Sequence, residues 1–118
     1  RYPERHPFRR EVTLVHHLEN GRPAEAAALA EAWVASDPLA PEPLRLLVRA
    51  RREAGDLSGM DAALARLRAL DPAKPEPLLY ALVQNQLAGR AEAAEAAFTD
   101  LLFRHGASPA LYTAAAAM

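Results

Sequence analysis

The sequence contains no cysteine and no isoleucine, and only one lysine. Without cysteine there can be neither a disulfide framework nor a thiolate metal site. The longest strongly apolar run spans residues 78–83, far short of the roughly 20 residues that cross a bilayer. Residues 1–10 are mostly polar, which is unlike the apolar segment of a signal peptide. Disulfide-stabilised and membrane-spanning classes are therefore excluded.

Alanine and leucine dominate what is present, with 28 and 18 residues out of 118. Both are good helix formers, whereas the β-branched residues typical of strands are few. The chain is 51% hydrophobic and 25% charged, as in ordinary folded proteins. We therefore predict an all-α fold. The sequence names no compartment, and a soluble cytoplasmic protein is the favoured interpretation.

The net charge of −1 gives no broad electrostatic reason to expect a nucleic-acid partner. Residues 1–10 nevertheless carry four arginines and one glutamate. We interpret residues 1–6 as a basic N-terminal arm. It could touch acidic lipid or nucleic acid, but a flexible terminus is the favoured interpretation, and we expect no nucleic-acid partner for the chain. The chain starts without methionine, so we expect it to be a piece of a longer protein.

A repeat of 34 residues runs through the sequence. Gly21, Gly55 and Gly89 are spaced by 34, and the tetrapeptide beginning at Pro41 recurs at Pro75. Asp-Pro and Ala-Ala pairs recur at the same offset. Coincidences at one fixed offset indicate a repeat architecture.

Each 34-residue unit reads as two helices joined by a tight turn. Apolar residues recur at helical spacing in each half of each unit. The expected sets are Val12, Val15 and Leu18, then Ala26, Ala30 and Trp33 in the first unit; Leu44, Leu47 and Val48, then Met60, Leu64 and Leu67 in the second; and Leu78, Ala81 and Leu82, then Ala94, Phe98 and Leu101 in the third.

Glycines and prolines mark where these helices are expected to begin and end. Gly55 stands where a left-handed C-cap residue belongs, and Asp56 can cap the helix that follows. Pro41, Pro75 and Pro109 lie at helix starts, where the missing N–H is harmless. Pro38 and Pro72 follow predicted helix ends, and Gly106 is expected to act as a C-cap.

This pattern resembles the tetratricopeptide repeat (TPR) family, whose units are 34-residue helix–turn–helix hairpins that often end in proline. The second-helix element A-x3-F is intact at Ala94 and Phe98 and weaker in the other units, and the first-helix element is eroded. In the first unit Arg10, Thr13 and His17 occupy positions that should be apolar.

The resemblance implies a right-handed α-solenoid of antiparallel helix pairs with about seven helices. The boundaries we predict are repeat 1 at 7–40, repeat 2 at 41–74, repeat 3 at 75–108, and a capping helix or the start of a fourth repeat at 109–118.

In TPR proteins the first helices line a concave face that holds a peptide or a protein segment. The resemblance places Arg45, Arg49 and Arg52 on that face, on one stripe of a helix. Guanidinium groups beside aliphatic side chains suit acidic and hydrophobic segments. Neighbouring units would flank the arginines with Glu11, Val15, Leu79, Val83 and Gln86. A plainer alternative is a solvated face on which Arg49 pairs with Glu53, and Glu42 with Arg45.

The sequence offers little for catalysis or metal binding. His16 and His17 are adjacent, so they point about 100° apart on a helix. No phosphate-binding, dinucleotide-binding or serine-hydrolase motif occurs. The TPR resemblance implies a protein-interaction module, and the absence of these motifs leads us to expect a non-enzymatic one with no cofactor, no metal and no catalytic residues.

The last segment gives the rival hypothesis. Residues 109–118 contain four successive alanines and no charged side chain, unlike the polar end of a typical array. The alternative is therefore self-assembly into a homo-oligomer through this apolar helix, or a scaffolding or regulatory extension of a larger protein, an enzyme included.

Overall fold

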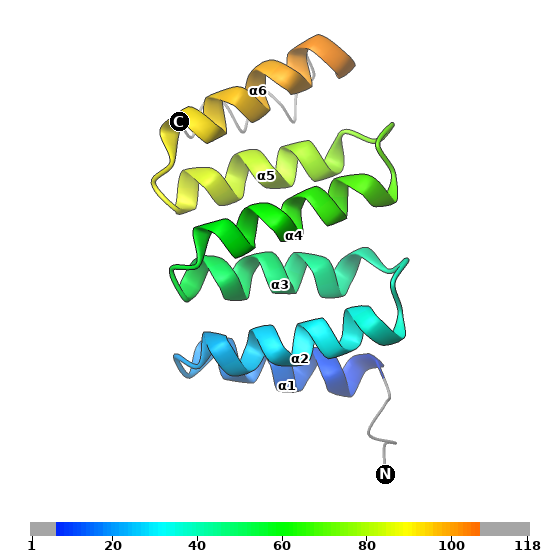
Figure 1. Ribbon diagram of the computed structural model, residues 1–118, viewed down its shortest axis with the longest axis vertical. Coiled ribbons are helices and arrows are strands. Elements are labelled where there is room, and N and C mark those ends of the chain that lie inside the picture. The colour runs from blue at the N-terminus through cyan, green and yellow to red at the C-terminus, as the bar shows by residue number, and fades with distance from the viewer. Residues whose placement is uncertain (1–6, 107–118) are drawn as a thin grey trace. The chain divides into compact units, whose positions relative to one another are not determined.

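The computed structural model describes residues 7–106, with side chains from residue 11 onward. All regular structure in this range is helical (Figure 1). The helices are α1 (Pro7–Glu19), α2 (Pro23–Ser36), α3 (Pro41–Glu53), α4 (Leu57–Leu70), α5 (Glu76–Leu87) and α6 (Ala91–His105). The prediction of an all-α fold is confirmed. The predicted arm at 1–6 and the predicted seventh helix at 109–118 lie outside the described residues.

The chain divides into two compact units, residues 1–70 and residues 71–118. We call them the N-terminal unit and the C-terminal unit. In the N-terminal unit α2 packs against both α1 and α3, α3 packs against α4, and α1 also contacts α3. In the C-terminal unit α5 packs against α6. Predicted repeat 1 and all of predicted repeat 2 except residues 71–74 fall in the N-terminal unit, and predicted repeat 3 falls in the C-terminal unit.

The turn inside each hairpin has the same hydrogen-bonded form. Gly21, Gly55 and Gly89 have φ of 69°, 78° and 74°, the left-handed region that glycine adopts without steric strain. The N–H two residues beyond each helix C-cap bonds back to a carbonyl near the helix end: Arg22 to His17 at 2.8 Å, Asp56 to Arg51 at 2.9 Å, and Arg90 to Asn85 at 2.8 Å. This is the Schellman motif. The predicted C-cap glycines are confirmed, including Gly106, with φ of 72°.

The helices also begin at the prolines where the sequence predicted helix starts. Pro41 is the first residue of α3 and Pro75 is the N-cap residue of α5. The Asp56 carboxylate accepts a hydrogen bond from the Gly59 N–H at 2.9 Å, which caps α4. Pro38 and Pro72 follow the ends of α2 and α4. Local sequence therefore determines where these helices begin and end.

The buried side chains follow the predicted repeat positions. Trp33, a member of the expected apolar set of the first unit, is buried, and Phe98 packs against the core of the C-terminal unit. The buried apolar residues of the N-terminal unit include Ala26, Ala30, Leu44, Leu47, Val48, Met60, Leu64 and Leu67, and those of the C-terminal unit are Leu78, Leu82, Ala94, Ala97 and Leu101.

The predicted apolar face of α1 is wrong at one position. Val12 is 51% exposed, whereas Leu14 is fully buried and Leu18 is only 4% exposed. Residues two apart on a helix point about 200° apart, so α1 cannot bury both Val12 and Leu14 on one face. The inner face runs through Leu14 and Leu18, and Thr13 is exposed while His17 is partly buried.

Candidate partner-binding surface

The three arginines predicted to bind a partner lie along α3 of the N-terminal unit. The exposed fractions of the Arg45, Arg49 and Arg52 side chains are 38%, 37% and 20%. Their spacing of four and three residues places them on one side of the helix. We call these residues the arginine stripe. Part of each side chain is shielded while part remains open to solvent, as is typical of long side chains that lie along a surface.

Two carboxylates of the same helix contact the stripe. Arg45 Nη1 donates to Glu42 Oε1, and Arg49 Nε donates to Glu53 Oε2 at 2.8 Å. Arg52 Nη2 lies 3.8 Å from the same Glu53 oxygen. The intrahelical pairs that the plainer alternative predicted are therefore present. Because α3 carries four arginines and two glutamates, the helix retains an excess of positive charge.

The other predicted groove residues lie on different helices. Val15 is a partly buried residue of α1, in the same unit as the stripe. Leu79, Val83 and Gln86 lie on α5 in the C-terminal unit, where Leu79 packs against the core and Val83 is exposed. Glu11 is exposed on α1. That the stripe and the α5 residues share one groove stays a prediction.

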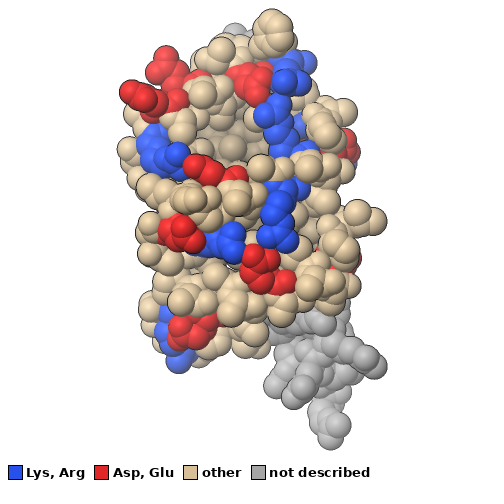
Figure 2. All heavy atoms as spheres, in the orientation of Figure 1, with Lys and Arg blue, Asp and Glu red and all other residues tan. Residues whose placement is uncertain are grey.

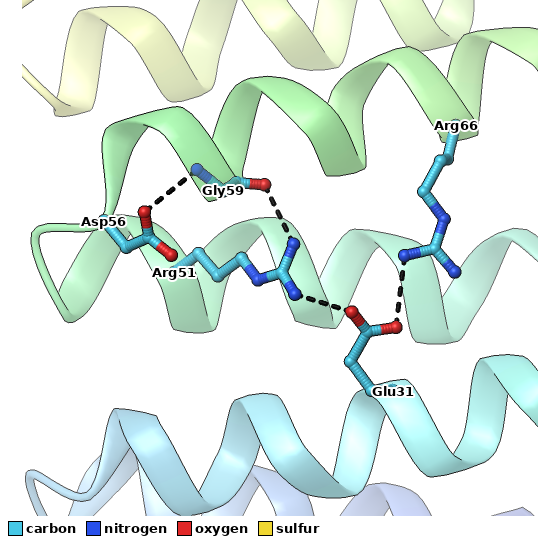
Figure 3. Close-up of polar contacts among 5 residues, drawn as sticks. All are labelled: Glu31, Arg51, Asp56, Gly59 and Arg66. Carbon is cyan, nitrogen blue, oxygen red and sulfur yellow. Dashed lines mark hydrogen bonds and ion pairs between the residues drawn. The ribbon is translucent and has the colours of Figure 1, made fainter.

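A polar network that the sequence did not reveal joins three helices of the N-terminal unit (Figure 3). The Glu31 carboxylate of α2 accepts a hydrogen bond from Arg51 Nη2 at 2.5 Å and another from Arg66 Nη1 at 3.1 Å. Arg51 Nη1 also donates to the Gly59 carbonyl oxygen at 3.1 Å. Arg51, which precedes Arg52 of the stripe in the sequence, therefore links α3 to both α2 and α4.

Glu31 stays ionised more readily than a free carboxyl. Burial alone would raise the pKa of the Glu31 carboxyl, but its hydrogen bond from Arg66 and the attraction of Arg66 and Arg51 outweigh that effect. The pKa is therefore lowered from its ordinary value of 4.5. A carboxylate between two guanidinium groups links α2 to both α3 and α4.

Gly59 leaves room for this network at the start of α4. A Cβ atom at residue 59 would lie 2.3 Å from Asp56 Oδ2 and 2.8 Å from Arg51 Cδ. A glycine in the first turn of a helix is an unusual choice, and that oddity is the sequence signal that could have pointed to a close approach. Glu31 carried no comparable signal, because its partners lie 20 and 35 residues away.

Other features of the described residues bear on metal binding and on membrane insertion. The His16 and His17 rings lie edge to face with centroids 6.3 Å apart. Within residues 7–106, no group of three or more histidine, aspartate or glutamate side chains is arranged to hold a metal ion. No described helix is both long enough and apolar enough to cross a membrane. Figure 2 shows basic and acidic side chains next to one another on the face drawn.

Comparison with protein-family models, with curated proteins and with solved structures found no match to this chain. The fold and the surface chemistry are therefore the basis for a functional proposal.

Proposed function

We propose that the chain is a TPR-like α-solenoid that acts as a non-enzymatic protein-interaction module. Its ligand is a peptide or protein segment that carries acidic and hydrophobic side chains. The repeat proposal is supported by three turns of one hydrogen-bonded form, spaced 34 residues apart. It is also supported by the successive packing of helices α1 to α4.

The arginine stripe carries the functional proposal. Its guanidinium groups already contact the carboxylates of Glu42 and Glu53 at the helix surface. A partner's carboxylates would make the same contacts, and arginine suits them because its planar fork can bind two oxygens at once. Val15 of α1, in the same unit as the stripe, would contact the apolar part of the segment. That Leu79, Val83 and Gln86 of α5 line the same groove stays a prediction.

Charge reversal on the stripe tests this function. The probe is a short fluorescein-labelled peptide of glutamate interspersed with leucine, and its control carries glutamine for glutamate. The chain should raise the fluorescence anisotropy of the acidic peptide only. Arg45→Glu combined with Arg49→Glu should weaken binding at least tenfold, about 1.4 kcal/mol, because attraction becomes repulsion.

The matched control for this experiment is Arg104→Glu on α6, where Arg104 pairs with Asp100 at 2.8 Å. It changes the charge of the chain in the same direction, by half as much as the double variant, at a site outside the stripe. Circular dichroism should show the same helicity for all three proteins. Equal affinity of the stripe variant and the unmodified chain would remove the stripe from the function.

Self-assembly is the second candidate, and one observation favours it. Phe103 on α6 is 88% exposed and the next residue in the chain before it, Leu102, is 40% exposed, and exposed apolar side chains that group on a surface mark interaction sites. The molar mass of the same samples, measured by light scattering, separates the candidates: a monomer at high concentration excludes self-assembly, and a mass that rises with concentration favours it.

A further inference from the structure

The carboxylates that contact the arginine stripe stand where a ligand's carboxylates would bind. We propose that Glu42 and Glu53 are built-in competitors of an acidic segment, and that they set its affinity by occupying the stripe when the segment is absent. This inference rests on the proposed function of the stripe as a binding surface.

The two glutamates enclose the stripe along the helix. Glu42 lies in the first turn of α3 and Glu53 is its last residue. One Glu53 oxygen accepts from Arg49 Nε at 2.8 Å and lies 3.8 Å from Arg52 Nη2. An incoming carboxylate that binds Arg49 through its Nε edge must therefore displace Glu53.

Displacement is feasible because the contacts are local and partly exposed. Side chains three and four residues apart on a helix pair weakly, and partly exposed ion pairs are screened by water and salt. The Glu42 and Glu53 side chains are 55% and 28% exposed. A ligand carboxylate held by several arginines at once can replace such contacts.

The neighbouring Arg51 provides the contrast that singles out these two glutamates. Its carboxylate partner, Glu31, comes from another helix and is held by Arg66 as well. Arg51 also bonds to the backbone of α4 through the Gly59 carbonyl. That network joins elements of the fold, whereas Glu42 and Glu53 belong to the helix whose arginines they contact.

An acidic segment is the occupant that the charges of α3 favour. The three arginines of the stripe outnumber the two glutamates of α3, while the fourth arginine of the helix, Arg51, pairs with Glu31 of α2. A partner that brings several carboxylates neutralises the stripe more completely than Glu42 and Glu53 do. Binding should therefore weaken as salt is added, because salt screens attraction between exposed charges.

Neutralising the competitors tests the inference. The double variant Glu42→Gln with Glu53→Gln keeps the size of both side chains. It should bind the labelled glutamate–leucine peptide roughly three- to tenfold more tightly than the unmodified chain, since the weak intrahelical pairs no longer compete. Anisotropy titrations at two salt concentrations measure the affinity, and circular dichroism checks that helicity is preserved.

The control variant separates competition from general electrostatics. Glu19→Gln with Glu25→Gln removes the same two charges from exposed positions on α1 and α2 of the same unit. Competition predicts tighter binding for the Glu42 and Glu53 variant only. Equal tightening by both double variants would overturn the inference, because net charge alone would then explain the effect.

The remaining outcomes distinguish this inference from the proposed function. If the unmodified chain binds the peptide and the Glu42 and Glu53 variant binds no more tightly, the inference fails and the function stands. If neither protein binds, both fail. If only the variant binds, the two glutamates block the stripe, which supports the inference and shows that the unmodified surface is closed to this peptide.

Discussion

At the scale of single residues, Gly59 shows how a small side chain can be required inside a helix. Alanine normally stabilises a helix relative to glycine by about 1 kcal/mol. Here its Cβ would lie 2.3 Å from Asp56 Oδ2, so the capping carboxylate and Arg51 would both have to move. We expect Gly59→Ala to lower the free energy of unfolding by about 1–2 kcal/mol, measured by urea denaturation.

The matched control is Ser58→Ala, one residue earlier at an exposed position of the same turn. It should leave stability unchanged or raise it slightly, since alanine is the better helix former. A stabilised Gly59→Ala variant would mean that the Asp56 cap and the Arg51 contact contribute less than helix propensity.

Residue identity alone predicted some positions well and others poorly. Gly55 was placed correctly because a left-handed turn selects glycine through local backbone geometry, and Gly21 and Gly89 adopt the same conformation. Val12 was misplaced because Leu14 and Val12 are both apolar, and only packing against neighbouring helices decides which one is buried. Local backbone preferences were therefore enough to predict the turns, whereas packing against neighbouring helices determines which face of α1 is buried.

At the scale of helices, the Glu31 carboxylate ties α2 to α3 and α4. Its pKa is lowered in the folded chain because Arg66 and Arg51 outweigh the effect of burial. A carboxyl with a depressed folded pKa contributes stability above its unfolded pKa, and that contribution is lost as pH falls through the folded value. We expect Glu31→Gln to lower the free energy of unfolding by about 1 kcal/mol at neutral pH, because Glu31 is partly exposed.

The pH dependence provides the internal check on this prediction. Below the lowered pKa both the native Glu31 and its glutamine replacement are uncharged, so the stability difference should shrink as the pH falls from 4.5 downward. Urea denaturation of both proteins at several pH values measures it. A difference that persists unchanged in acid would assign the loss to packing or hydrogen bonding.

The helices were predictable, whereas the contacts among them were less so. Proline and glycine punctuation predicted the bounds of α3 and α4 closely, because these residues act through the local backbone. The stripe pairs Arg45–Glu42 and Arg49–Glu53 were foreseen because they lie three and four residues apart. The Glu31 network spans 20 and 35 residues of sequence, and no local rule connects such distant positions.

At the scale of the whole molecule, the division into two compact units predicts how the chain unfolds. Proteins open locally in cooperative units, so a weakened compact unit can open while the other stays folded. Leu82 is fully buried in the core of the C-terminal unit. Leu82→Ala should destabilise that unit by about 2–5 kcal/mol, through lost burial and the cavity left behind.

Hydrogen exchange followed by mass spectrometry resolves this prediction by segment. With Leu82→Ala, amides of α5 and α6 should exchange faster, while those of α2 and α3 should keep most of their protection, because their packing lies in the N-terminal unit. The control is Leu87→Ala on the same helix, at a residue 61% exposed, which should change exchange little. Equal acceleration throughout α1 to α6 would contradict the prediction, because it would mean that the two units unfold as one cooperative structure.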